Sequence, residues 1–182
     1  NPVLATEVLE SGSDTLGGVR QKVTVLFADI RSFTSISESM DAVNLVSMLN
    51  DYFTYELDPI FDNGGLLDKF IGDATLAVFG APIHRGNQAE ASAAIEAALE
   101  IETRLQNLNQ TWEKQGEPSW QQVIVLSFGT VISGNIGSSR RMDYTVIGDA
   151  VNTASRLEAV AKQCQRSIVM SQGVADLVRN HW

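Results

Sequence analysis

Residues 66–79 read LLDKFIGDATLAVF, two short apolar runs on either side of a Gly72–Asp73 pair. Such runs about a glycine-containing pair predict a β-hairpin, for which a tight turn with glycine first is one possible closure. Upstream, residues 23–28 are apolar and rich in β-branched side chains, which predicts a strand buried on both faces that ends at Asp29. The hairpin and this strand form the expected centre of a β-sheet.

Segments with helical periodicity separate and follow these strands. Apolar side chains recur at three- and four-residue steps over residues 41–61 and again over residues 89–112. The other expected elements are a strand over 123–128, a further part of the sheet over 129–136, a turn at 137–142, a helix over 149–163, a strand over 167–170 and a final helix from Ser171. The order β-α-β-β-α-β-α-β predicts one α+β domain whose antiparallel sheet is covered by helices on one face.

Composition narrows the classes of function. The chain has 182 residues, of which 44% are hydrophobic and 19% charged, as expected for one globular domain. Its 22 acidic against 13 basic residues give a net charge of −9, which disfavours nucleic-acid binding but allows a small anionic substrate at a metal. A single cysteine excludes an internal disulfide, and no apolar run reaches the length of a membrane span. We therefore expect a cytoplasmic domain over residues 21–182, preceded by a linker or short helix over residues 1–20.

Two aspartates are placed where a carboxylate needs a partner. Asp29 ends the most hydrophobic strand and Asp73 sits in the hairpin turn. In a β-α-β-β sheet the first strand commonly lies beside the hairpin, so both carboxylates are expected at one edge. Two carboxylates with backbone oxygens suit Mg²⁺ that also binds substrate phosphates. The alternative is that both are ordinary turn or N-cap residues.

Other polar residues are weaker candidates on their own. The segment 30–34 can present backbone N–H groups to a phosphate, or can simply connect a strand to a helix. Asn152 and Arg156 share one helix face and can stabilise developing negative charge, although a solvated face with an Arg156–Asp149 or Arg156–Glu158 ion pair explains them equally. Lys69 can read a base edge or lie on the surface.

The remaining basic side chains give little further direction. Arg140 and Arg141 occupy a turn, where they can hold a triphosphate or face solvent. His84 and His181 are isolated from other metal-ligating side chains, so we expect both to be structural or exposed.

Taken together, three stretches resemble the catalytic domain of class III adenylyl and guanylyl cyclases. They are residues 23–34 (VTVLFADIRSFT), 68–74 (DKFIGDA) and 142–158 (MDYTVIGDAVNTASRLE), and they occur in the order of that family. The resemblance implies a ferredoxin-like, palm-type βαββαβ antiparallel sheet that functions as a head-to-tail homodimer. The sequence resembles bacterial members of the family, particularly those of cyanobacteria.

The resemblance also implies roles for individual residues. Asp29, Asp73 and the Ile30 carbonyl match the ligands of two Mg²⁺ ions per active site, with Mn²⁺ as a substitute. The positions that match phosphate-binding residues are Ile30, Arg31, Ser32, Phe33, Thr34 and Arg140. Asn152 matches the residue that orients the ribose, and Arg156 the residue that stabilises the transition state.

Lys69 and Thr145 match the two positions that read the purine, and this pair resembles that of adenine-selective members. The implied reaction converts ATP into 3′,5′-cyclic AMP and pyrophosphate by two-metal catalysis, for signal transduction. The alternatives are a guanylate cyclase, or an inactive cyclase-homology domain that dimerises or binds nucleotide.

Because the family divides each site between two subunits, one chain carrying every site residue implies a homodimer with two interfacial active sites. Two departures from the family pattern stand out. Ser32 replaces a common glycine, and no lysine follows Lys162, so the lysine-bearing hairpin that usually follows is expected to be cut off. A regulatory domain is expected upstream in the parent protein.

Overall fold

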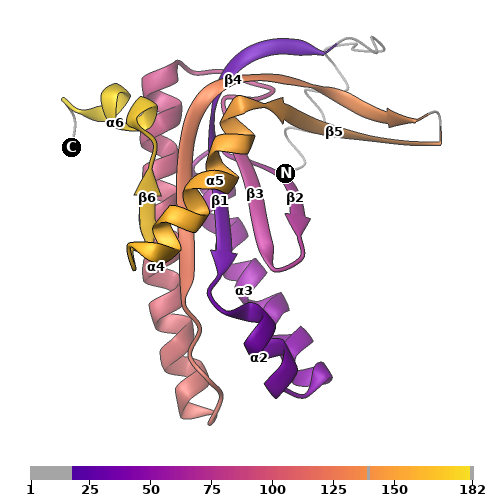
Figure 1. Cartoon of the computed structure of the whole chain (residues 1–182), viewed down its shortest axis with the longest axis vertical. Helices are drawn as coiled ribbons and strands as arrows, with labels where there is room; N and C mark the ends of the chain where they lie inside the picture. The colour runs from indigo at the N-terminus through magenta and orange to yellow at the C-terminus, as the bar shows by residue number, and fades with distance from the viewer. Residues whose placement is uncertain (1–17, 139, 181–182) are drawn as a thin grey trace.

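A computed structural model describes residues 18–138 and 140–180 of the chain. Its centre is one sheet of six strands, ordered β2-β3-β1-β4-β5 with β6 beside β4 (Figure 1). All neighbouring strands run antiparallel except β4 and β6, which are parallel. The strands are β1 (Val19–Ile30), β2 (Leu66–Ile71), β3 (Ala74–Phe79), β4 (Gln122–Ser138), β5 (Arg141–Gly148) and β6 (Ile168–Met170).

The helices complete the α+β class that the sequence predicts. They are α2 (Phe33–Ser39), α3 (Ala42–Asp62), α4 (Asn87–Lys114), α5 (Asp149–Gln163) and α6 (Gln172–Val178). The elements β1, α3, β2, β3, α4 and β4 form the expected βαββαβ core, which is confirmed. Helix α2 lies where the sequence indicated only a polar loop with a serine cap.

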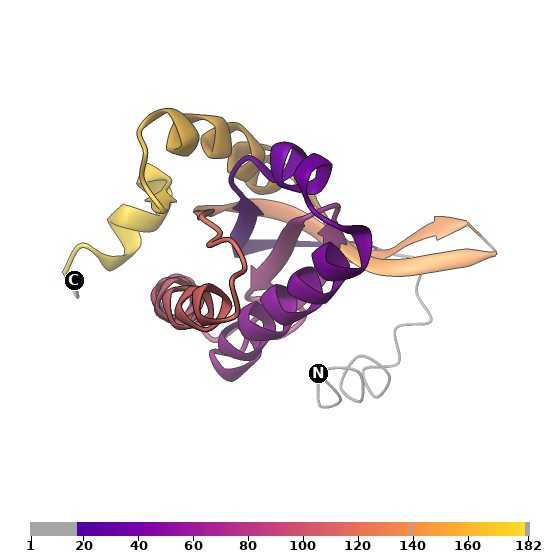
Figure 2. The same ribbon diagram turned by 90° about the horizontal axis from the view of Figure 1, so that it is seen from below.

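Helices cover both faces of the sheet, so the expectation of helices on one face is wrong for the whole domain. Leu26 and Ala28 of β1 pack with α4, whereas Val23 and Val25 pack with α5. Alternate residues of a strand point to opposite faces, and Figure 2 shows α3 and α4 on one side of the sheet and α5 on the other. A strand that is apolar on both faces needs cover on both, and α5 supplies the second layer.

The β2–β3 hairpin is confirmed. Ile71 pairs with Ala74, so Gly72 and Asp73 form a two-residue turn, and Gly72 has a φ of 65° that favours glycine. The strand register shifts between Leu67 and Lys69, which marks a bulge at Asp68. Asp73 is thereby fixed at the end of the sheet where β1 also ends.

Other boundaries differ from the expected ones. β1 begins at Val19, so residues 19 and 20 belong to the sheet rather than to a linker, while residues 1–17 lie outside the described residues. The segment 122–138 is one continuous strand, which with β5 forms a hairpin that projects from the body of the molecule (Figures 1 and 2). His181 lies outside the described residues, as does Trp182. No helix in the described part of the chain is long and apolar enough to cross a membrane.

Candidate active site

Asp29 and Asp73 meet at one end of the sheet, as the sequence predicts. Asp29 lies one residue before the end of β1, and Asp73 lies in the turn before β3, whose Thr75 pairs with Ala28 of β1. Burial raises the pKa of Asp29, a hydrogen bond from Lys162 opposes that rise, and the negative charge of Asp73 adds to it. The two carboxylates are therefore close enough to repel each other electrostatically.

Lys162, near the end of α5, partly neutralises this acidic site. Its ammonium donates to Asp29 and also forms an ion pair with Glu158, one helical turn earlier. Burial acts to lower the pKa of Lys162, but the hydrogen bonds to Asp29 and Glu158 outweigh it and raise the pKa. The sequence indicated no role for Lys162 and suggested Glu158 only as a partner of Arg156, because the contacts of this part of α5 with β1 depend on how the helix packs; Arg156 pairs with Asp149 instead.

The site fits a divalent cation that also binds substrate. Among residues 18–138 and 140–180, no cluster of three or more His, Cys, Asp or Glu side chains could hold a metal. Two carboxylates, of which Asp29 is partly desolvated and paired with Lys162, would leave several positions around a cation for other oxygen ligands. Mg²⁺ commonly fills such positions with water and nucleotide phosphates.

The segment after Asp29 forms the expected turn into a helix. Ser32 adopts the left-handed conformation, with φ of 58° and ψ of 29°, and no side chain caps the start of α2. Phe33 packs edge-on against Trp120, with ring centroids 6.3 Å apart, whereas Thr34 is exposed. The left-handed φ explains why glycine suits position 32, since side chains other than glycine are strained there.

The Arg31 side chain points away from this turn. Its guanidinium donates to the carbonyl oxygens of Arg166 at 2.7 Å and of Ala161, Lys162 and Gln122 at 3.4 Å each. Arg31 therefore satisfies carbonyls at the C-terminal end of α5. The Arg31 amide donates to the Gln121 carbonyl at 2.7 Å, so in this structure both the side chain and the backbone N–H of Arg31 are occupied, contrary to the phosphate-binding role that the resemblance implies.

Lys69 and Thr145 are brought together by Asp68. The Thr145 hydroxyl donates to Asp68 Oδ2 at 3.0 Å, the Val146 amide donates to Asp68 Oδ1 at 3.3 Å, and Lys69 Nζ lies 3.4 Å from Oδ2. The Asp68 side chain is only 1% exposed, while that of Lys69 is 46% exposed. One buried carboxylate thus holds an ammonium and a hydroxyl in a fixed relation, and sequence reasoning quoted Asp68 without assigning it a role.

Asn152 and Arg156 lie apart from the aspartates of the same chain. Asp29 contacts Lys162 near the end of α5, whereas Asn152 lies in the first turn of that helix, roughly 15 Å away along its axis. The Arg156 guanidinium donates to Asp149 at 3.3 Å and to Thr153 at 3.1 Å, and its side chain is exposed. A single chain therefore does not bring these residues to one reacting centre.

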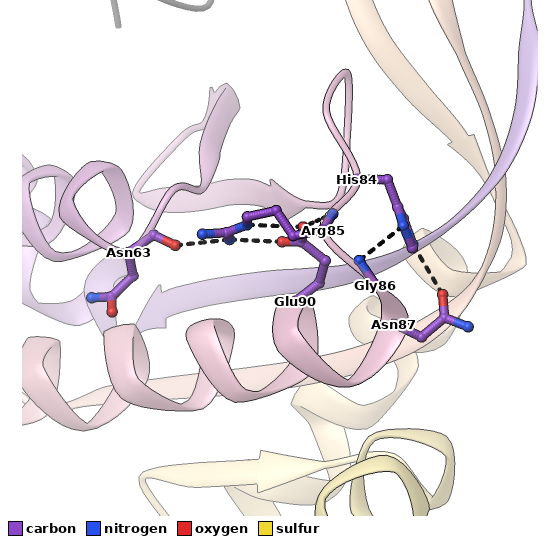
Figure 3. Close-up of polar contacts among 6 residues, drawn as sticks. All are labelled: Asn63, His84, Arg85, Gly86, Asn87 and Glu90. Atoms are coloured by element: carbon purple, nitrogen blue, oxygen red, sulfur yellow. Dashed lines mark hydrogen bonds and ion pairs between the residues drawn. The ribbon is translucent and has the colours of Figure 1, made fainter.

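The structure also shows the surroundings of Arg140 and His84. Arg140 is exposed at the tip of the β4–β5 hairpin, where its amide donates to the Ser138 hydroxyl at 3.3 Å. His84 accepts from the Gly86 amide at 3.1 Å and lies 3.0 Å from the Asn87 side-chain oxygen, so the expectation of a structural histidine is confirmed (Figure 3).

Comparison with known proteins places this geometry in a family. The model of the adenylate and guanylate cyclase catalytic domain matches residues 18–181. An adenylate cyclase of Anabaena cylindrica is 37% identical over 164 residues, which cover 88% of this chain and 31% of that protein. The chain thus spans about a third of the length of that relative.

Two solved structures share the fold at similar identity. The adenylyl cyclase CyaB of P. aeruginosa superimposes with a TM-score of 0.84 at 34% identity, over 91% of this chain and 84% of that one. The guanylyl cyclase Cya2 does so with a TM-score of 0.81 at 34% identity, over 89% of this chain and 80% of that one. By sequence and by fold, this chain belongs to the class III nucleotide cyclases and forms their catalytic domain.

Proposed function

We propose that this chain is the catalytic domain of an adenylate cyclase, which converts ATP into 3′,5′-cyclic AMP and pyrophosphate. The observation that carries the choice of ATP is the cluster of Lys69, Asp68 and Thr145. The similarity to the Anabaena adenylate cyclase and to CyaB supports the same choice. Because the chain spans only part of that relative, the activity of the whole protein belongs to this proposal.

The hydrogen-bond roles in this cluster match adenine. The hydroxyl proton of Thr145 is donated to Asp68, so the Thr145 oxygen is left to accept a hydrogen bond from a ligand. Lys69 can only donate. Adenine offers an acceptor at N1 and donors at N6, whereas guanine offers a donor at N1 and an acceptor at O6. With Lys69 at N1 and Thr145 at the six-position, adenine satisfies both groups and guanine opposes both.

The phosphate end of the site is assigned to β1 and the start of α2. Asp29, Asp73 and the Ile30 carbonyl would hold two Mg²⁺ ions, with Mn²⁺ as a substitute. When bound, the metals supply positive charge that stabilises the attacking and leaving oxygens at phosphorus. The backbone amides of residues 32–34 lie at the N-terminal end of α2, where no side chain caps the helix and so none would compete with a phosphate.

A complete site requires two copies of the chain. One copy would provide Asp29 and Asp73, and its partner would provide Asn152 and Arg156 together with Lys69 and Thr145. Asn152 would orient the ribose, Arg156 would stabilise charge on the phosphorus being attacked, and Arg140 would contact the terminal phosphates. Exposed apolar side chains next to the base-reading residues, Phe70, Ile71 and Ile147, are the kind of surface that such a dimer buries.

The direct test is product formation from ATP and from GTP, each with Mg²⁺ and with Mn²⁺. We expect cyclic AMP from ATP and little product from GTP. The double variant Lys69→Glu, Thr145→Gly should lose ATP use, because both base contacts are removed. The similarity to Cya2 makes guanylate cyclase the second candidate, and cyclic GMP as the main product would establish it in place of our proposal.

A further inference from the structure

Glu56 of α3 is a buried carboxyl group with no basic partner. Only 1% of the surface of Glu56 is exposed to solvent. Oε1 lies 2.9 Å from the Tyr52 hydroxyl, and Oε2 accepts from the Thr75 hydroxyl. No Lys, Arg or His among residues 18–138 and 140–180 forms an ion pair with it. A carboxylate buried in this way is costly unless it is neutral.

Among the residues that the structure describes, Glu90 is the second fully buried glutamate, and its environment is different. Glu90 at the start of α4 is also 1% exposed, but Arg85 faces it (Figure 3). The Arg85 guanidinium donates to Glu90 Oε1 at 3.0 Å and to Oε2 at 2.8 Å, and the Arg85 amide donates to Oε1 at 2.7 Å. Glu90 is thus balanced as an anion, while Glu56 meets only hydroxyl groups.

Counting protons shows which form of Glu56 completes its hydrogen bonds. The single Tyr52 hydroxyl lies 2.9 Å from Glu56 Oε1 and 3.0 Å from Gln122 Oε1. Gln122 Nε2 donates to Glu102 Oε2 at 3.1 Å, so turning this amide over would set two acceptor oxygens against each other. Burial raises the pKa of Tyr52, which therefore keeps its one proton. That proton cannot serve two acceptors.

A protonated Glu56 resolves the conflict. Its own hydroxyl then donates to Tyr52, Tyr52 donates to Gln122, and Gln122 donates to Glu102, while Thr75 donates to the remaining oxygen of Glu56. Every link then has one proton and one acceptor. An ionised Glu56 would leave one of the two oxygen–oxygen contacts of Tyr52 without a proton, although Tyr52, Glu56 and Gln122 are each no more than 2% exposed.

We propose that Glu56 keeps its proton in the folded domain up to near-neutral pH, and that in this form it is a positioning residue that fastens α3 to the start of β3, beside the turn that carries Asp73. This inference deepens the proposed function, on which its catalytic part rests. Thr75 lies two residues after Asp73 and pairs with Ala28, the residue before Asp29. Fixing the position of Thr75 therefore also fixes the end of β1 and the start of β3, where the two aspartates lie.

The charges around Glu56 favour the same state. Asp29 faces it from β1, Glu102 of α4 lies at the far end of the hydrogen-bond chain, and Asp73 acts on Tyr52 from the hairpin turn. Among the described residues, two cations lie near this hydrogen-bond chain and both have other partners: Lys162 of α5 is held by Asp29 and Glu158, and the Arg31 guanidinium donates to the backbone carbonyls of Gln122 and of residues at the end of α5. Burial raises the pKa of Glu56 to about 7, hydrogen bonds from Thr75 and Tyr52 oppose the rise, and the charge of Asp29 adds to it.

The first test measures stability and does not depend on activity. Between the ordinary pKa of 4.5 and about 7, the unfolded chain has lost this proton and the folded chain keeps it, so the wild type loses stability as pH rises. Glu56→Gln keeps a donor and an acceptor and has no proton to lose. We expect the melting temperature of Glu56→Gln minus that of the wild type to be roughly 5 °C or more higher at pH 8 than at pH 5.

Glu90→Gln is the matched control, since the same substitution there removes a charged partner of Arg85. We expect it to lower the melting temperature by roughly 4 °C near pH 7. Infrared spectra of the wild type at pH 6 should also show a protonated carboxyl band that disappears in Glu56→Gln. A constant difference between Glu56→Gln and the wild type over this pH range, or absence of the band, would overturn the proposal.

The second test addresses positioning. If only the neutral form holds the metal site, the ratio of the kcat of Glu56→Gln to that of the wild type should rise to about tenfold at pH 8, because each pH unit above the pKa leaves a tenth of the neutral form. An unchanged ratio with the stability result intact would overturn the positioning role alone. Absence of cyclase activity in both proteins would count against the proposed function and would leave the stability result to judge the state of Glu56.

Discussion

At the scale of single residues, Asp68 connects Lys69 and Thr145, a role that the sequence did not indicate. Lys69 and Thr145 were identified from the resemblance, but the carboxylate that joins them was not. The hydrogen bond from Thr145 to Asp68 spans 77 positions of the chain, and it forms because β5 returns to the bulge in β2. No local pattern reports such a return, so only the fold could reveal this residue.

Replacing Asp68 with alanine should weaken base selection. The Thr145 hydroxyl would regain a free proton and Lys69 would lose its nearest anion, so neither group would keep its role toward adenine. We expect kcat/KM for ATP to fall by about tenfold or more, with a smaller ratio of ATP to GTP use. Steady-state kinetics with both nucleotides would measure this. An unchanged nucleotide ratio in a folded Asp68→Ala protein would show that the base is read elsewhere.

Asp73 gives a sharper prediction, because its side chain forms no hydrogen bond or ion pair with residues 18–138 or 140–180. Asp73→Ala should abolish metal-dependent turnover, while removal of its charge from beside Asp29 leaves the melting temperature within about 2 °C of the wild type. Activity and thermal unfolding, measured on the same preparation, separate the two effects. Substantial turnover by the variant would remove Asp73 from the metal site.

The sequence did not indicate Glu56 as a core residue. The periodicity of α3 assigned the stripe of Val43, Val46, Leu49, Phe53, Leu57 and Ile60 to the core, whereas the structure buries Met48, Tyr52, Glu56, Pro59 and Ile60 and leaves Val43 and Val46 exposed. A charged residue on the buried face of a helix is unusual. The pattern also could not provide the contacts of Glu56, since Thr75 of β3 contacts it directly and Gln122 of β4 only through Tyr52.

At the scale of elements, the start of α2 shows how one backbone conformation sets a preference for a residue type. Ser32 has a left-handed φ of 58°, whereas Ser35 lies inside the helix and is exposed. Ser32→Gly should therefore stabilise the domain by about 0.5 kcal/mol, and Ser35→Gly should destabilise it by about 0.5–1 kcal/mol. Chemical denaturation of both variants tests the pair, and changes of equal sign would contradict this explanation.

The C-terminal end of α5 depends on Arg31. Because its guanidinium satisfies carbonyl oxygens there, Arg31→Ala should lower the melting temperature by roughly 4 °C. Arg140→Ala removes an exposed arginine from a hairpin tip and is the control, with an expected change of less than about 1 °C. Equal melting temperatures for the two variants would argue against a stabilising role for Arg31.

The sequence was a good guide to the elements and a poorer one to their layers. The β2–β3 hairpin and the helices α3 and α4 followed from local periodicity and turn residues. The second helical layer did not, although the signal was present in the run 23–28, whose two apolar faces both need cover. The sequence pattern indicated a division of β4 near residue 129 and no strand over Arg141–Gly148, because the outer half of the projecting β4–β5 hairpin is exposed and lacks the apolar pattern of a buried strand.

At the scale of the whole molecule, the separation along α5 is decisive. Asp29 lies against the end of this helix and Asn152 lies at its start, so one chain cannot bring both to a single phosphorus atom. The two-fold dimer that we propose would solve this by placing the start of one α5 opposite the aspartates of the other copy. The net charge of −9 is compatible with an anionic substrate if metal ions and a few hydrogen-bond donors bind that substrate.

The dimer should make activity depend on protein concentration. Specific activity with ATP should rise as the protein concentration increases through the dissociation constant of the dimer, and then level off. Sedimentation at the same concentrations gives the fraction of dimer. Specific activity that stays constant while this fraction changes would show that a single chain is sufficient.

The central claim is that each active site is divided between two copies of the chain, and mixing two inactive variants tests it most directly. Asp29→Ala would lack a proposed metal ligand and Arg156→Ala the proposed transition-state arginine, so each alone should be inactive. Random mixing should give one intact site in each heterodimer and restore about a quarter of the wild-type cyclic AMP production per chain. Continued inactivity of a mixture in which heterodimers are shown to form would contradict the shared site.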